Sequence, residues 1–310
     1  MVEIKAQRNA YGEALAELAE ERKDIVVLDA DLSHATMTSI FAAKYPERFF
    51  NMGIAEQNLM GVACGMAHTG LTVFASTFAM FGAGRAYEIV RNAICYSKAN
   101  VKIALSHSGL CVGEDGGSHQ CIEDIALMRI LPGMKVIVPC DWIEAKKAVR
   151  AAAAINGPVY LRIARPPVAP ITDDSTPFEI GKANIMREGK DVCIITMGLI
   201  THEALKAADI LKEKGINAAV VNMHTIKPLD IETLFAMANK CGAIVTAEEH
   251  LLAGGLGSAV SEALMGKVNI KFGMVGINDT FGRSGAPDKL FAAYHIDASA
   301  IVEKCLSIIK

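Results

Sequence analysis

Two histidines and two acids lie close together in a glycine-rich stretch that reads SHSGLCVGEDGGSHQ (residues 106–120). The side chains of His107, Glu114, Asp115 and His119 could transfer protons or hydrogen-bond a polar substrate. The two histidines are too far apart in sequence for their spacing alone to indicate a metal site. The Gly-Gly-Ser within the stretch could simply cap the following helix, but capping requires neither histidine. We therefore expect this stretch to line a polar pocket.

Glu56 is a second candidate, because it opens a helix that is otherwise apolar and rich in small residues (NMGIAEQNLMGVACGMAHTG, residues 51–70). An acid in the first turn interacts favourably with the helix dipole, which would explain Glu56 without any chemistry. Alternatively, apolar neighbours such as Ile54 and Leu59 could bury the carboxyl and raise its pKa, so that it stays protonated and can donate a proton. The residues leave both explanations open.

Phe78 and Phe81 are three residues apart, which predicts that their rings share one face of a helix over about 78–96. Such a pair usually packs in a core. Here, however, the predicted helix begins just after a predicted strand, and Gly82 and Gly84 leave room for a ligand ring to stack beside the phenylalanines. Core packing and ring binding both remain open.

Arginines supply a third kind of chemistry. Arg162 and Arg165 follow one predicted strand, and Arg8 lies in the first predicted helix. A planar guanidinium suits a phosphate ester because it can donate two parallel hydrogen bonds. Although each arginine alone could be a solvated surface residue, together they are candidates for binding a phosphorylated substrate.

These residues need elements that bring them together, and the sequence predicts a parallel sheet with helices on both faces. Short apolar runs alternate with longer helical patterns, which is typical of α/β proteins. Such sheets bind ligands at the carboxyl ends of their strands, and polar stretches beginning at Asp29, Ser76, Ser106 and Arg162 stand at these ends. The predicted strands are 25–30, 71–76, 101–106, 135–139 and 158–163, and the predicted helices lie near 10–22, 56–68, 78–96 and 142–155.

A second, shorter α/β set follows a proline-rich segment that has no sustained period. The sequence therefore predicts two α/β domains with parallel or mixed sheets, over residues 1–166 and 191–310, joined by a linker over 167–190. In the second set the predicted strands are 192–198, 217–223, 243–249 and 271–276, and the predicted helices lie near 201–214, 229–240 and 257–266.

Composition excludes several classes of function. The chain of 310 residues has a formal net charge of −3, which gives no reason to expect a nucleic acid or an anionic membrane as a partner. Its amino-terminal stretch is a charged amphipathic helix rather than a secretion signal, and no apolar run reaches the ~20 residues that span a bilayer. The eight cysteines form no C-x-x-C pair, which favours reduced thiols in a cytoplasmic protein over disulfides or zinc ligands.

Several motifs occur in the same order as in the C-terminal half of transketolase, and the chain resembles that half from Arg8 to its final helix. They are DADLS, GIAEQN, STFAMF, VGEDGGSHQCIEDIALMRILP and EEHLLAGGLGSAVSEAL. Transketolases carry a near-identical G-E-D-G-x-x-H-Q. The resemblance implies a pyrimidine-binding domain for thiamine diphosphate, followed by a transketolase C-terminal domain, in a transferase of carbohydrate metabolism that serves the pentose phosphate pathway.

The resemblance also implies how the chain would bind the cofactor. In this family the glutamate equivalent to Glu56 protonates a ring nitrogen of the aminopyrimidine, which is a task for a neutral, buried acid. Phe78 and Phe81 match the aromatic slot that stacks on this ring, and Ile54 lies beside it.

The substrate contacts that the resemblance implies are sugar contacts and a phosphate grip. The two histidines and Asp115 match positions that contact sugar hydroxyls or assist proton transfer, and Asp31 matches an aspartate near the sugar. Arg8 and Arg165 match the pair of residues that holds the terminal phosphate. Two positions depart from the family: Ala35 replaces a serine that helps to hold this phosphate, and Gly84 replaces an aromatic residue of the pyrimidine pocket. The matched substrate residues are Arg8, Asp31, His107, Asp115, His119 and Arg165.

The family's G-D-G…N motif, which holds magnesium and the diphosphate of the cofactor, has no counterpart in this sequence. The resemblance therefore implies a split transketolase, in which a separate N-terminal subunit binds Mg²⁺ and the diphosphate and this chain supplies no metal ligand. We expect activity only with that partner, in a heterotetramer with two copies of each chain. The expected reaction transfers a two-carbon ketol unit from a ketose phosphate, such as xylulose 5-phosphate, to an aldose phosphate, such as ribose 5-phosphate.

Two other interpretations remain. The beta subunit of a 2-oxo acid dehydrogenase, or an enzyme like deoxyxylulose-phosphate synthase, shares the fold but differs in the 106–120 stretch. A non-catalytic scaffold subunit would be expected to have lost Glu56, the phenylalanines or the histidines, all of which are present. We expect no catalytic residue from the second domain, where EEHLLAGGLGS (248–258) is interpreted as a subunit contact.

Overall fold

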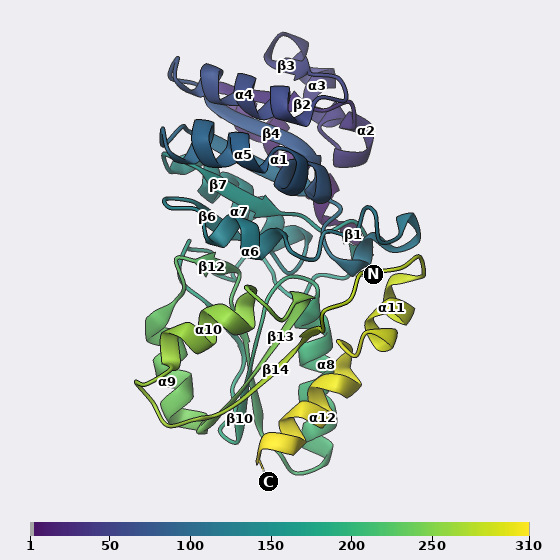
Figure 1. Cartoon of the computed structure of the whole chain (residues 1–310), viewed down its shortest axis with the longest axis vertical. Coiled ribbons are helices and arrows are strands. Elements are labelled where there is room, and N and C mark those ends of the chain that lie inside the picture. The colour runs from purple at the N-terminus through teal and green to yellow at the C-terminus, as the bar shows by residue number, and fades with distance from the viewer. Residues whose placement is uncertain (1–2, 310) are drawn as a thin grey trace.

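Residues 3–309 are described by the computed structural model, which has two α/β lobes stacked along its long axis (Figure 1). Within these residues the strands form a seven-stranded sheet, a five-stranded sheet and a two-stranded ribbon. Each of the two large sheets is mainly parallel and carries one antiparallel edge strand. The predicted fold class, α/β with parallel or mixed sheets, is confirmed.

The larger sheet is built from apolar runs that are buried from end to end, as in Ile25–Asp29 and Val101–Ser106. β-Branched residues suit such a doubly covered sheet because they pack well on its pleated surface. Its strands, in spatial order, are β12 (Thr225–Lys227), β6 (Lys135–Ile137), β7 (Val159–Arg162), β5 (Val101–Ser106), β4 (Thr72–Phe78), β2 (Ile25–Asp29) and β3 (Phe49–Asn51).

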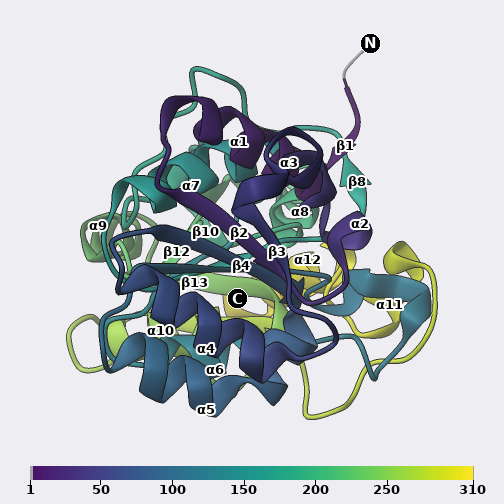
Figure 2. The ribbon, with the colours of Figure 1, turned by 90° about the horizontal axis from the view of Figure 1, so that it is seen from above.

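Helices cover both faces of this sheet because each presents an apolar stripe to it (Figure 2). Residues of α1, α3 and α7 share a core with one face, and residues of α4 and α6 pack on the other. Short 3₁₀ turns lie at Pro46–Arg48 and Leu110–Asp115. The α-helices of this lobe are α1 (Gln7–Glu21), α2 (Ser33–Thr36), α3 (Ser39–Lys44), α4 (Glu56–Ala67), α5 (Tyr87–Ile89), α6 (Asp124–Arg129) and α7 (Trp142–Ala154).

The segment 78–96 is not the single helix that its spacing predicts. Strand β4 continues to Phe78, and two π-helical turns, Met80–Arg85 and Val90–Cys95, flank the short α5. Phe78 and Phe81 therefore do not share a helix face, and that prediction is wrong. All of β4 is buried, so pairing with its neighbours on both sides outweighs the helical spacing. Single π-turns often occur at functional sites.

The second lobe repeats the α/β pattern on a smaller scale. Its sheet runs in the order β14 (Lys271–Ile277), β13 (Ala243–Leu251), β10 (Val192–Thr196), β11 (Ala218–Asn222) and β9 (Asn184–Arg187). No helix between residues 3 and 309 is long and apolar enough to cross a membrane. The helices of this lobe are α8 (Ile200–Glu213), α9 (Ile231–Cys241), α10 (Leu256–Leu264), α11 (Pro287–Ala293) and α12 (Ala298–Ile309).

The two lobes interlock. The segment 167–190, expected as a linker, contains β8 (Pro167–Val168), which pairs with β1 (Lys5–Ala6), and β9, which joins the smaller sheet. In the other direction, β12 leaves the second half of the chain and pairs with β6 of the larger sheet. One apolar core continues from α4 to α9 and α10. The second lobe therefore gives rigid support to the first.

Gly12 shows how tightly α1 is seated on the first lobe. A Cβ at this position would lie 2.2 Å from the main-chain oxygen of Met37, so only glycine permits the approach. We predict that Gly12→Ala lowers the free energy of unfolding by about 1–3 kcal/mol, because the main chain must shift.

Gly65 of α4 provides the matched control, since a Cβ there meets nothing within 4 Å. Gly65→Ala should be neutral or should stabilise by about 0.5–1 kcal/mol, because alanine favours the helix. Chemical denaturation of both variants measures the difference. Equal stability of the two variants would contradict this account of α1 packing.

Candidate active site

The candidate residues lie at the carboxyl-terminal end of the larger sheet, where β2, β4, β5 and β7 end side by side. This end of the sheet is called the carboxyl edge below. Phe78 on β4 stands opposite Ser106 on β5, and Asp29 ends the adjacent β2. His107 directly follows β5, and Arg165 lies just beyond β7. Residues that are distant in sequence meet because their strands are neighbours in a parallel sheet.

Four aromatic rings form one cluster at this edge. Phe78 stacks on His107 with ring centroids 3.8 Å apart, and it lies 6.0 Å from Phe81 with nearly parallel planes. The edge of His119 approaches Phe81 at 5.4 Å. Phe78 is buried and one of its faces is covered by His107, whereas Phe81 is partly open. A ligand ring would therefore find its open aromatic surface on Phe81.

His107 has an unusual backbone conformation and a lowered pKa. Its φ of 56° is left-handed, which is rare for a residue other than glycine. Burial lowers the pKa of His107 to about 3, and the positive charges of Arg8, Arg165 and His119 act in the same direction. Nδ1 lies 2.9 Å from the hydroxyl of Ser106. His107 is therefore neutral at pH 7 and can exchange a hydrogen bond or a proton with a ligand.

Arg8 and Arg165 form a cationic pair beside these rings. Burial lowers the pKa of Arg8, and repulsion from Arg165 adds to the effect. Arg8 Nη1 donates to the main-chain oxygen of Ala35 at 2.9 Å, whereas its buried Nε has no partner in the described chain. Arg165 donates to the main-chain oxygen of Val112 and to Glu114. Two neighbouring cations, one of them with an unsatisfied donor, are suited to bind an anion.

Glu56 begins α4 and is only 4% exposed. It follows a turn at Gly53, whose φ is 69°. Arg85 Nε lies 3.9 Å from its carboxylate, which accepts no hydrogen bond within residues 3–309. Ile54, in contrast, is 83% exposed. Glu56 is thus both a first-turn acid and a sheltered carboxyl with free hydrogen-bonding capacity, and Ile54 presents an apolar surface close by.

Asp31 and Asp115 are both exposed but differ in how they are held. Asp31 has a left-handed φ of 64°, and its carboxylate accepts a hydrogen bond from the Asn51 amide at 2.8 Å. The same amide accepts the N–H of Gly53 at 2.9 Å, so Asn51 links Asp31 to the turn before Glu56. The side chain of Asp115 has no contact of this kind among residues 3–309. Asp31 is therefore linked through Asn51 to the turn that precedes Glu56, whereas Asp115 lies on the surface of its loop.

Sequence reasoning missed Asn51, Arg85 and Glu249. A polar residue just before a glycine turn was a signal for Asn51, which stands in the stretch that contains Glu56. Arg85 and Glu249 gave no such signal, because each contacts a residue that is distant in sequence. Arg85 lies near Glu56, and Glu249 accepts a hydrogen bond from a residue 138 positions away. Glu248, Glu249 and His250 are buried inside this chain, so any subunit contact of 248–258 would have to use the residues from Leu251 to Gly254, which are exposed or partly exposed.

Two family models match the chain. One is "Transketolase, pyrimidine binding domain", over residues 4–169, and the other is "Transketolase, C-terminal domain", over residues 181–301. The chain belongs to the transketolase family. The resemblance predicted from the motifs is confirmed.

Individual members of the transketolase family match nearly the whole chain. The "Putative transketolase C-terminal section" of Methanocaldococcus jannaschii is 48% identical over 309 residues, 99% of this chain and 97% of that protein. A "6-deoxy-6-sulfo-D-fructose transketolase subunit" of Clostridium sp. (strain MSTE9) is 39% identical, covering 95% of this chain and 92% of that protein. A solved structure, "Split gene transketolase, inactive beta4 tetramer", is 51% identical with a TM-score of 0.92 and covers 98% of both chains. This chain thus corresponds to the C-terminal section of a split transketolase.

The two departures from the transketolase pattern have local consequences. At Ala35 the main-chain oxygen, rather than a side chain, contacts Arg8. At Gly84 the methyl group of Met80 fills part of the space, because it lies 2.5 Å from where a Cβ would stand. The flexible methionine replaces some of the wall that an aromatic residue would build.

We predict that Arg8→Ala raises the pKa of His107, because a nearby guanidinium disfavours the imidazolium. NMR titration of histidine ring carbons in this chain measures the shift. Arg150→Ala removes an arginine that pairs with Glu17 and Glu21 instead, and it should leave His107 unchanged. A His107 pKa near the ordinary value of about 6.5 in the unmodified chain would contradict the burial argument.

Proposed function

We propose that this chain is the C-terminal subunit of a split, thiamine-diphosphate-dependent transketolase that transfers a two-carbon ketol unit from a ketose phosphate to an aldose phosphate. Xylulose 5-phosphate and ribose 5-phosphate are the proposed donor and acceptor, which would place the enzyme in the pentose phosphate pathway of the cytoplasm. The observation that carries the proposal is one sheet edge with a sheltered acid, an open aromatic face and a cationic pair, in a chain of this family.

The residues at this edge fit the aminopyrimidine of thiamine diphosphate. The carboxyl of Glu56 is buried and free of hydrogen bonds within the described chain, Phe81 offers an open face, and Ile54 adds apolar surface. When bound, this cofactor supplies the carbon nucleophile that carries the ketol unit. Glu56 would hold a proton at its carboxyl and share it with a ring nitrogen, while Phe78 and Phe81 would hold the ring in place.

Other residues of the edge would bind the sugar. His107 is neutral at pH 7, so it can accept a hydrogen bond from a sugar hydroxyl or take its proton. His119, packed against Phe81, would act beside it, and Asp31 and Asp115 would bind further hydroxyls. Arg8 and Arg165 would hold the terminal phosphate, which would satisfy the unpartnered Nε of Arg8.

The diphosphate and Mg²⁺ would be bound by an N-terminal subunit, in a heterotetramer with two copies of each chain. Two observations support a partner. Ile54 is an exposed apolar residue beside the buried Glu56, and the similar solved structure of split-gene transketolase beta chains is described as inactive.

A sulfonated ketose is a second candidate donor. The relative from Clostridium sp. is named for 6-deoxy-6-sulfo-D-fructose, and two guanidinium groups suit a sulfonate as well as a phosphate. Comparing kcat/KM for a phosphorylated and a sulfonated donor decides between them.

We predict that this chain, its N-terminal subunit, thiamine diphosphate and Mg²⁺ together catalyse ketol transfer, and that neither chain does so alone. Glu56→Gln should lower kcat by about 100-fold or more, because an amide cannot transfer the proton. Glu303→Gln on the exposed face of α12 is the control and should have full activity. Substantial turnover by the Glu56→Gln enzyme would remove Glu56 from the mechanism. If the correctly assembled, unmodified chains were inactive, a scaffold function would be favoured.

We also predict that Arg165→Ala raises KM for a phosphorylated donor by about 10- to 100-fold, because a charged hydrogen bond contributes about 1.5–3 kcal/mol. KM for an unphosphorylated ketose should change far less, since that donor makes no contact with the guanidinium. Steady-state kinetics of the assembled enzyme measure both values. A similar increase for both donors would show that Arg165 does not bind the phosphate.

A further inference from the structure

Glu249, at the end of β13 in the second lobe, reaches into the stretch 106–120 of the first lobe. Its carboxylate accepts the main-chain N–H of Cys111. Gly109 lies so close that a Cβ there would stand 2.5 Å from the carboxyl carbon of Glu249, and its φ of 74° also requires glycine. The main chain that follows His107 therefore packs closely around this carboxylate.

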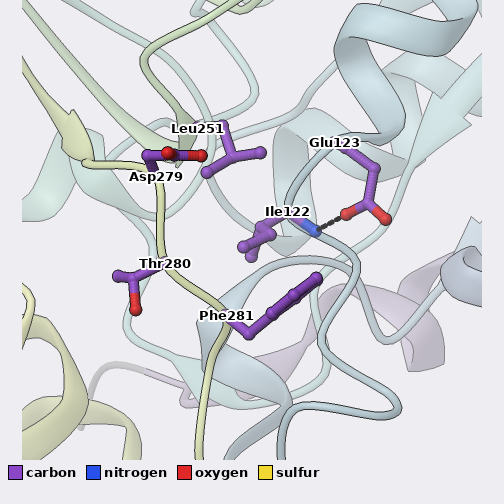
Figure 3. A pocket seen from close by; sticks show the side chains of 6 residues that line it. All are labelled: Ile122, Glu123, Leu251, Asp279, Thr280 and Phe281. Carbon is purple, nitrogen blue, oxygen red and sulfur yellow. Dashed lines mark hydrogen bonds between the residues drawn. The ribbon is translucent and has the colours of Figure 1, made fainter.

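A second contact closes the other end of the stretch. A Cβ on Gly117 would lie 2.5 Å from the main-chain oxygen of Gly282, and Gln120 donates to the main-chain oxygen of Arg283 at 3.0 Å. The second lobe also approaches the middle of the stretch, because Gly113 lies close to Gly285 and Gly116 lies close to Ser284. Just beyond the stretch, a pocket of about 190 Å³ is lined by residues of both lobes (Figure 3). The pocket is lined by Ile122, Glu123, Leu251, Asp279, Thr280 and Phe281.

Packing alone does not require an acid at position 249. The residue is 4% exposed, and burying a carboxylate is unfavourable unless it is hydrogen-bonded or paired. Burial raises the pKa of Glu249 to about 7, against the opposing charge of Arg162. The charged or titratable groups that face it are Arg162, Asp124 and Cys111. Its carboxylate accepts the main-chain N–H of Cys111 in the His107 stretch, and an apolar side chain could not accept this hydrogen bond.

We propose that Glu249 is a positioning residue, which holds the N–H of Cys111 and thereby fixes residues 107–115 against the aromatic cluster. The second lobe thus orders a catalytic stretch of the first. The proposal rests on the proposed function only for the chemistry that His107 performs, because the order of the stretch can be measured in this chain alone.

Hydrogen–deuterium exchange of the full chain tests this order. Because charge-assisted hydrogen bonds are roughly twice as strong as neutral ones, amides of 107–115 should exchange about fivefold faster in Glu249→Gln, and faster still in Glu249→Ala. In the unmodified chain the same amides should lose protection, relative to their intrinsic rates, as the pH falls through about 7, since protonation removes the charge. Glu249→Gln should lack this pH dependence.

Glu248→Gln is the matched control, because Glu248 is also buried on β13 but accepts the N–H groups of Leu256 at 2.7 Å and Gly257 at 2.8 Å. This variant should loosen the start of α10 and leave 107–115 protected. Unchanged exchange of 107–115 in Glu249→Gln, or an equal increase in Glu248→Gln, would overturn the proposal. If Glu249→Ala fails to fold, the comparison of Glu249→Gln with Glu248→Gln still tests the proposal.

The assembled enzyme provides a separate measurement. Glu249→Gln should lower kcat by about fivefold, because the stretch that carries His107 is then less well ordered. Unchanged kcat together with faster exchange would also overturn the positioning role, since catalysis would then not depend on the order of the stretch. An unmodified enzyme without ketol transfer would instead contradict the proposed function and leave the exchange result standing.

Discussion

Parallel pairing of β2, β4, β5 and β7 is the constraint on which the rest of the site depends. Each strand ends in a residue of a different chemical type, and the pairing brings these ends to one edge. A shift of two residues in the register between β4 and β5 would move Phe78 away from Ser106, and would separate the stacked pair of Phe78 and His107. The helices and the second lobe matter to function because they keep this pairing buried and therefore fixed.

The carboxyl edge has two regions, one positively charged and one largely apolar. Around His107, two guanidiniums and burial maintain a positive field with a neutral imidazole inside it. Glu56 has apolar surface beside it and one guanidinium, that of Arg85, at 3.9 Å. An anionic group is attracted to the first region, whereas an uncharged ring is accommodated in the second. The two regions therefore suit two different groups, an anion at the arginines and an uncharged ring beside Glu56.

Much of this could be predicted from residue patterns. The buried strands, the location of polar residues at their carboxyl ends and the two-domain division follow from apolar periodicity, which acts over short distances in sequence. The path of the chain at 78–96 could not be predicted in this way, because burial of β4 by its neighbours overrides the spacing of Phe78 and Phe81. The contacts of Arg85 with Glu56 and of Glu249 with Cys111 depend on tertiary packing between distant segments, for which a single sequence carries no signal.

Strand β12 has a consequence for how the polypeptide can be divided. It comes from the second half of the chain, yet it completes the larger sheet by covering the side of β6. A truncated fragment ending near residue 166 would leave that side of β6 with unpaired backbone groups, which invite edge-to-edge aggregation. The pyrimidine-binding region is therefore not an autonomous module, and any gene fusion or excision that respects the fold must keep residues 225–227 with it.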